Sequence, residues 1–175
     1  MLRSDPLADP QPLIRRVYAY VAYRIGHGPE AEDVTSEVFE NAIRYRSSYD
    51  PRRGEPIAWL IGIARRCIAS SVPRAPTPAQ ETEGVAASAD LEQETVDRLA
   101  LASGLSKLAE RDQELLALKF GADLSARRIG ELLDMRPNAV DVAVHRALAR
   151  LRDELDQRER PGDPVPRLDP VKRTV

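Results

Sequence analysis

The chain has 175 residues, 42% hydrophobic and 31% charged, which suits one ordinary domain or two small ones. Only 5% of the residues are aromatic, and this favours two compact cores over a single large one. No apolar run approaches the roughly 20 residues that span a bilayer, and the first residues lack the apolar core of a secretory signal. We therefore expect a cytoplasmic protein without a membrane segment.

The residue counts argue against enzymatic and metal chemistry. Cys67 is the one cysteine, so an internal disulfide is excluded, and His27 and His145 alone do not make a metal-ligand cluster. The acidic residues lie on polar helix faces without a paired histidine or cysteine and without a phosphate-binding glycine loop. We expect no catalytic residue, no metal and no cofactor, and we interpret Cys67 as a core residue.

The net charge of −2 hides segments of opposite sign. Basic residues outnumber acidic ones over residues 11–74, whereas residues 75–104 hold six acidic residues and Arg98 alone as a base. The stretch "APTPAQETEGVAASAD" has almost no large apolar side chain, so burial cannot offset its ordering entropy. We interpret residues 75–90 as a flexible acidic linker, and residues 1–12 and 160–175 as disordered tails.

The first domain, residues 13–74, shows three helical patterns. Apolar residues recur at three- and four-residue steps from Leu13 to Ile25, where a glycine-rich stretch follows. A second pattern runs from about Pro29 to Arg46, with Ile43 among its inward residues, and a third begins near Pro56. Between the second and third lies the loop "SSYDPRRGEP", whose arginines and aromatic side chain suit unstacked bases and phosphates.

The second domain, residues 91–159, is also helical by its pattern. Helices are expected at about residues 93–108 and 111–120, and Gly121 is interpreted as a helix C-cap. Ser125 is an expected N-cap of a short helix that cannot be stable without a neighbour. After a tight turn, Pro137 opens a longer helix that buries Val140 and Val144. The fold class is therefore all-α, with two small helical domains and no strand pattern.

Two helices joined by so tight a turn match a helix-turn-helix, whose second helix can enter the DNA major groove. Helix pairs of this kind are also common in all-helical domains, and outward arginines are usually solvated. The pattern alone leaves these two interpretations evenly balanced.

The stretches "AEDVTSEVFENAIRYRSSYDP", "AWLIGIARRCIAS" and "LSKLAERDQELLALKF" shift that balance. Their order and spacing resemble the extracytoplasmic-function sigma factors, the two-domain minimal sigma subunits of bacterial RNA polymerase. The resemblance runs from Leu13 to about Leu155. It implies a sigma factor that binds core polymerase, through its beta-prime and beta subunits, and promoter DNA. It also implies control by an anti-sigma factor, which nothing in the sequence identifies.

The resemblance assigns roles to particular residues. Docking on the beta-prime subunit would fall on the polar face of the second helix, at Asp33, Glu37, Glu40, Asn41 and Arg44. The loop at residues 47–53 would hold a base of the melted minus-ten element, and the third helix, with Trp59 as a core aromatic or DNA neighbour, would flank that strand. The expected DNA-binding residues are Tyr49, Arg52, Arg53, Arg65, Arg66, Arg127, Arg128, Arg136, Asn138, Asp141, Val142, His145 and Arg146.

This chain departs from the family pattern at several positions. Ser36 and Ser70 stand where a glutamine and an aspartate are usual, and Arg136 replaces a usual N-capping serine. In the expected recognition helix, Asp141 and Ala143 stand where the family pattern commonly has two cations. A carboxylate can accept from cytosine N4 but cannot pair with phosphate, so we expect an altered or weak minus-thirty-five contact. The alternative function is a helix-turn-helix regulator that dimerises through its N-terminal helices.

Overall fold

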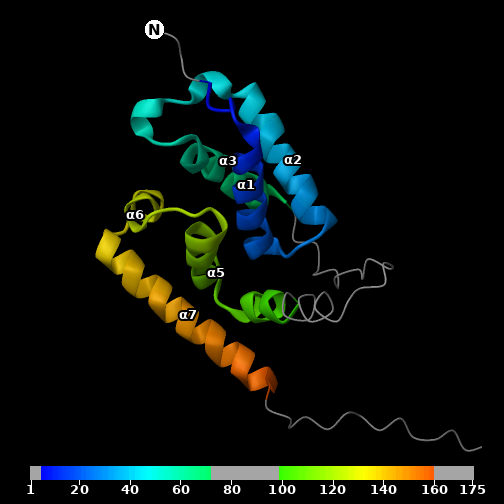
Figure 1. Cartoon of the computed structure of the whole chain (residues 1–175), viewed down its shortest axis with the longest axis vertical. Helices are drawn as coiled ribbons and strands as arrows, with labels where there is room; N and C mark the ends of the chain where they lie inside the picture. The colour runs from blue at the N-terminus through cyan, green and yellow to red at the C-terminus, as the bar shows by residue number, and fades with distance from the viewer. Residues whose placement is uncertain (1–4, 72–98, 160–175) are drawn as a thin grey trace, which may run out of the picture.

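The computed structural model describes residues 5–71 and 99–159, and every regular element in these ranges is helical. The predicted linker and the tail beyond residue 159 lie outside them. Helices α1–α3 form one lobe and the elements from residue 99 onward form a second lobe beside it (Figure 1). No helix in the described residues is both long enough and apolar enough to cross a membrane.

The first lobe is a bundle of α1 (Pro10–Ile25), α2 (Pro29–Arg44) and α3 (Pro56–Ser70), each packed on the other two. A proline stands in the first turn of each helix, where its missing N–H costs no hydrogen bond. Helix α1 thus begins inside the segment predicted as a disordered tail, and α2 ends two residues before its predicted limit. Two 3₁₀ turns, η1 (Arg46–Ser48) and η2 (Pro51–Arg53), form the connection to α3.

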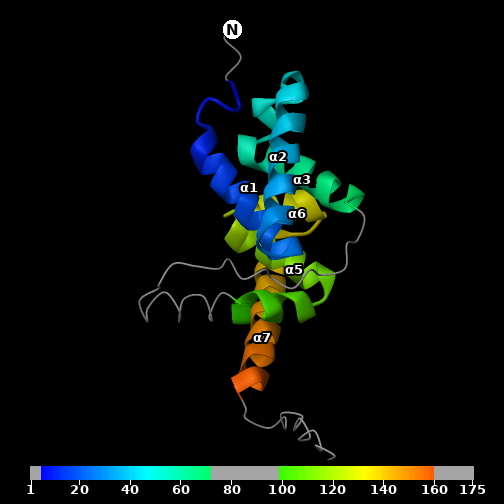
Figure 2. The same ribbon diagram turned by 90° about the vertical axis from the view of Figure 1, so that its right-hand side faces the viewer.

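The second lobe begins with a helix whose described part covers residues 99–107. It continues through α5 (Glu110–Leu116), the π-helical segment η3 (Ala117–Gly121), α6 (Ala126–Leu133) and the long α7 (Pro137–Glu159). Helix α7 runs along α5 and α6 and away from the first lobe (Figure 2). The helix predicted over residues 111–120 is therefore two segments of different winding.

The core differs from the expectation of two separate cores. Buried side chains of both lobes form one continuous cluster, because α1 packs directly on α5 and η3. The expectation that Ile43 points inward is wrong, since its side chain is 65% exposed. Cys67 is buried on α3 among the core residues, as predicted.

Gly121 serves this packing and not the termination of a helix. Its φ is not positive, and the left-handed residue of this turn is Asp123, with φ 52°. A Cβ atom at Gly121 would lie 2.8 Å from the Cα and the backbone N of Tyr20. Glycine is therefore required because the backbones of α1 and η3 approach so closely. The C-cap interpretation is wrong.

Candidate nucleic-acid and polymerase interfaces

The helix-turn-helix forms as the sequence predicts. The Ser125 hydroxyl accepts a hydrogen bond from the backbone N–H of Arg128, at 3.3 Å, and so caps α6. Asp134 takes the left-handed conformation after α6, with φ 53°, and Pro137 opens α7 three residues later. A Cβ at Gly130 would collide with the carbonyl oxygen of Met135, so only glycine allows the chain to turn this tightly.

Helix α7 divides its residues between core and solvent as expected. Val140 and Val144 are buried, and the face predicted to meet DNA is exposed. That face consists of Asn138, Asp141, Val142, His145 and Arg146. Arg136 precedes them and is also exposed, while its carbonyl accepts from the N–H of Val140 at 3.1 Å. Arg136 thus takes the N-cap position through its backbone.

An open groove of about 630 Å³ separates the start of α7 from α5. Arg111, Asn138, Val142, Arg146 and Arg150 are among the residues that line it. Arg150 is ion-paired with Asp112 across 2.7 Å, so Arg111 and Arg146 contribute the groove's remaining arginine charge.

The arginines of α6 are already paired. The Nε of Arg127 lies 3.3 Å from a carboxylate oxygen of Glu131, and a terminal nitrogen of Arg128 lies 2.5 Å from the other oxygen. The hydrogen bond from Arg128 is the main reason that the pKa of Glu131 is lowered. These ion pairs reduce the net positive charge on the exposed side of α6.

The connection between α2 and α3 is held in place by an aromatic pair. The rings of Tyr49 and Trp59 lie 5.6 Å apart at 55°, and the Tyr49 hydroxyl donates to the carbonyl of Gly54 at 3.0 Å. Burial, followed by the nearby carboxylates, raises the pKa of Tyr49. Arg52 and Arg53 are exposed beside this pair. Tyr49 therefore positions the loop, and the two arginines are the groups it presents to solvent.

Helix α3 carries the other two arginines predicted to contact DNA. Both Arg65 and Arg66 are exposed, so they are accessible to a ligand on this side of the first lobe. Arg65 also bonds to the second lobe, since its terminal nitrogen donates to the carbonyl of Leu132 at 3.3 Å.

The polar face of α2 is exposed at four of the five positions predicted for polymerase binding, namely Asp33, Glu37, Glu40 and Arg44. Asn41 is half-buried, and its side-chain nitrogen lies 3.6 Å from the Cys67 sulfur. Burial is the main cause of the raised pKa of the Cys67 thiol. Asn41 is therefore directed toward α3, and the accessible face consists of the other four residues.

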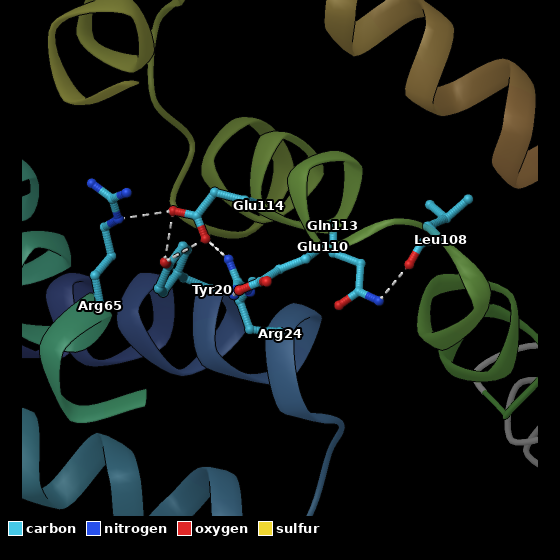
Figure 3. Close-up of polar contacts among 7 residues, drawn as sticks. All are labelled: Tyr20, Arg24, Arg65, Leu108, Glu110, Gln113 and Glu114. Carbon is cyan, nitrogen blue, oxygen red and sulfur yellow. Dashed lines mark hydrogen bonds and ion pairs between the residues drawn. The ribbon is translucent and has the colours of Figure 1, made fainter. Parts of the chain in front are cut away.

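The structure also reveals a polar cluster that the sequence pattern did not predict (Figure 3). The carboxylate of Glu114 on α5 accepts from the Tyr20 hydroxyl, at 3.0 and 3.1 Å to its two oxygens. It also pairs with Arg24 on α1 and, across 3.1 Å, with the Nε of Arg65. Its side chain is 8% exposed. A buried carboxylate is thus shared between two lobes.

Burial dominates the chemistry of Tyr20 in this cluster. It raises the pKa of Tyr20 to about 12, against a smaller opposing effect of Arg24 and Arg65. The phenol therefore stays neutral and can donate to Glu114. The signal in the sequence was the spacing Arg16, Tyr20, Arg24, which places three polar groups along one stripe of α1.

The described geometry defines an all-helical protein with a three-helix lobe, a basic connecting loop and a helix-turn-helix with an exposed second helix. Comparison with known families agrees: residues 11–75 match sigma-70 region 2 and residues 98–151 match sigma-70, region 4. The chain belongs to the extracytoplasmic-function (ECF) group of the sigma-70 family.

Three relatives illustrate this membership. The chain is 28% identical to the ECF RNA polymerase sigma factor BldN of Streptomyces coelicolor, over 77% of this chain and 54% of BldN. It is 27% identical to the ECF RNA polymerase sigma factor SigK of Mycobacterium ulcerans, over 81% of this chain and 80% of SigK. It is 27% identical to the RNA polymerase sigma factor CarQ of Myxococcus xanthus, over 82% of this chain and 85% of CarQ. The match to BldN thus spans about half the length of that protein.

Proposed function

We propose that this chain is an RNA polymerase sigma factor, a non-catalytic subunit that binds core polymerase and directs it to promoters. One observation carries the proposal: a single chain joins a region 2-like bundle with a basic loop to a region 4-like helix-turn-helix. Its relatives BldN, SigK and CarQ are themselves sigma factors.

The first lobe would bind the melted minus-ten strand. Arg52 and Arg53 are exposed on the loop, and Arg66 is exposed on α3. A single strand offers unpaired bases for stacking and a backbone for charge. The Tyr49–Trp59 pair supports this role by holding the loop at a fixed distance from α3.

The second lobe would bind duplex DNA through the first turns of α7. Asn138, His145 and Arg146 are exposed there and can donate hydrogen bonds to bases or phosphates. Asp141 lies on the same exposed face and would repel phosphate, so it would have to meet an amino group such as cytosine N4. With Arg127 and Arg128 partly neutralised by Glu131, binding by this lobe alone should be weak and salt-sensitive.

The polymerase would bind the exposed face formed by Asp33, Glu37, Glu40 and Arg44. An acidic face on a rigid helix suits a basic helical partner such as a coiled coil, and the beta-prime subunit is the partner we assign to it. The beta subunit and an anti-sigma factor are further proposed partners, the second of them regulatory. We place the protein in the cytoplasm, where polymerase is found.

Affinity purification with core polymerase tests the proposal. The tagged chain should form a stoichiometric complex with purified core enzyme and remain monomeric alone in analytical ultracentrifugation. The matched control is the same chain with Glu37→Lys and Glu40→Lys, which should lose the complex. A stable dimer that ignores core enzyme and binds palindromic duplex DNA would instead establish the helix-turn-helix regulator.

A further inference from the structure

The carboxylate of Glu114 is satisfied only when the two lobes are together. In the described part of the chain, every side chain that bonds to it belongs to the first lobe: Tyr20, Arg24 and Arg65. A buried carboxylate left without partners would cost far more than an exposed one. Separation of the lobes must therefore bring water to Glu114.

A second anchor lies one helical turn away along α1. The guanidinium of Arg16 donates to the carbonyls of Ala122, at 2.8 Å, and Asp123, at 2.9 Å. These carbonyls follow the end of η3, where a helix leaves acceptors unpaired. Gly121 allows the close approach of the backbones at this point. Arg16 and Gly121 thus extend the contact made by Glu114.

The contact uses residues that the proposed function requires for DNA. Arg65 is bonded to both Glu114 and the carbonyl of Leu132. Arg128 of α6 donates to the carbonyl of Arg53 in the basic loop, at 3.4 Å. The candidate minus-ten surface and the candidate minus-thirty-five lobe therefore touch each other.

Promoter binding requires a different arrangement. Elements centred near minus ten and minus thirty-five are about 25 base pairs apart, which is on the order of 85 Å along a duplex at about 3.4 Å per base pair. The loop at Arg53 and the helix-turn-helix at Arg128 are instead in direct contact. The observed arrangement cannot engage both elements at once.

We propose that the contact between the lobes is an autoinhibitory latch, formed by Arg16, Tyr20, Arg24, Arg65, Glu114 and Gly121, which holds the free protein closed. In the closed state Glu114 is ion-paired with Arg65, the arginine that would otherwise contact the DNA backbone. DNA phosphate and Glu114 therefore compete for Arg65, and promoter engagement requires opening of the latch. The inhibitory role rests on the proposed function, whereas the closed state does not.

The latch has features of a contact that can open. Arg65 remains 41% exposed, so a phosphate can reach it from solvent. The Nε of Arg24 is buried without a hydrogen-bond partner in the described part of the chain, which weakens the contact. DNA phosphate can replace the carboxylate as the anionic partner of Arg65, and water that enters between the separated lobes can solvate Glu114.

Distance measurements on the full chain test the closed state. Spin labels on cysteines at the exposed positions Glu32 of α2 and Arg152 of α7 report the separation of the lobes. The unmodified chain should give a narrow distance distribution. Glu114→Gln removes the charge that Arg24 and Arg65 pair with, and Gly121→Ala inserts a Cβ against α1, so both should broaden the distribution toward longer distances.

Each variant has a matched control. Glu110→Gln removes a carboxylate that also pairs with Arg24, but that side chain is 86% exposed. Gly62→Ala adds a Cβ in α3 where no atom lies within 4 Å. Both controls should keep the narrow distribution, and circular dichroism should show unchanged helicity in all four variants. A broad distribution in the unmodified chain, or no change in E114Q and G121A, would overturn the latch.

A binding measurement tests the inhibition. Because apparent affinity scales with the open fraction, E114Q and G121A should bind oligo(dT) of about 12 nucleotides about fivefold more tightly than the unmodified chain. The controls should stay within about twofold. If the lobes separate in E114Q and G121A but the affinity for oligo(dT) does not increase, the contact between the lobes does not inhibit DNA binding. Failure to bind core polymerase would refute the sigma factor proposal and leave the distance result standing.

Discussion

Helices α1 and α2 are alike in sequence pattern and differ in what their polar sides do. Each has 16 residues, begins at a proline and packs an apolar face into the core. The polar side of α2 is exposed at Asp33, Glu40 and Arg44, which make no ion pair among the described residues. The polar side of α1 carries Arg16, Tyr20 and Arg24, which contact the second lobe.

The difference shows that similar polar stripes on two helices can serve different structural roles. The role of each stripe depends on whether a complementary group reaches it from elsewhere in the chain. For α1 that group is Glu114, 94 residues from Tyr20. For α2 the complementary group would belong to polymerase. One helix therefore joins the two lobes, and the other is available for a partner.

The largest effect should come from removing Tyr20. Its side chain is fully buried between the lobes, so Tyr20→Ala should lower the free energy of unfolding by about 3–5 kcal/mol. Ile43→Ala on α2 is the matched control, because that side chain is 65% exposed and should cost about 0.5 kcal/mol or less. Urea denaturation measures both. Equal decreases in the free energy of unfolding for the two variants would contradict the proposal that α1, and not α2, joins the lobes.

Alkaline pH should weaken the α1 contact. The pKa of Tyr20 is raised from 10.0 to about 12, so the neutral phenol favours the folded state. This contribution is complete below pH 10 and is lost as the pH rises from 10 to 12. At about 1.4 kcal/mol per pKa unit, the free energy of unfolding should fall by about 2–3 kcal/mol over this range. Denaturation of Tyr20→Phe over the same range should show a shallower fall, and an identical fall would assign the effect to other groups.

Charge reversal on α2 should act on binding and leave folding intact. Glu37→Lys with Glu40→Lys should weaken core polymerase binding at least about tenfold, or about 1.4 kcal/mol. The free energy of unfolding should change by about 0.5 kcal/mol or less per exposed site. Asp153→Lys with Asp156→Lys on α7 provides the same charge change at exposed positions elsewhere. If the variant with Glu37→Lys and Glu40→Lys still binds core polymerase, the proposal that polymerase docks on this face of α2 is wrong.

The smallest effect should come from the basic loop. Arg52→Ala with Arg53→Ala should impair promoter opening while core binding is unchanged, since both side chains are exposed and neither belongs to the proposed docking face of α2. The salt dependence of single-strand binding should fall by about 0.7 for each phosphate that the loop no longer neutralises. Arg15→Ala, also exposed, is the control. An unchanged salt slope would show that the loop does not bind the DNA backbone.

Local signals in the sequence predict helix starts and caps, but not the start of α1 at Pro10 or the change of winding at η3. Prolines predicted the starts of α2, α3 and α7, and Ser125 predicted the cap of α6. Each of these residues acts on its own or adjacent backbone, so its effect can be predicted without knowing the rest of the fold.

The contact between the lobes could not be predicted in the same way. The sequence pattern favours a local C-cap at Gly121, whereas a Cβ at this residue would meet the backbone of Tyr20, about a hundred residues away in sequence. Ile43 follows the apolar period of α2 but lies on its exposed side. Glu114 resembles any helical acid until Arg24 and Arg65 are brought to it. Such pairings depend on tertiary structure, which periodicity does not encode.

Run-off transcription with purified core enzyme, on promoters from the same genome, tests whether this chain acts as a sigma factor. We expect discrete transcripts that require the chain, disappear with Glu37→Lys and Glu40→Lys, and persist with Asp153→Lys and Asp156→Lys. Glu114→Gln should yield at least as much transcript as the unmodified chain. An absence of chain-dependent transcripts, with core binding shown in the same preparation, would contradict the assignment as a sigma factor.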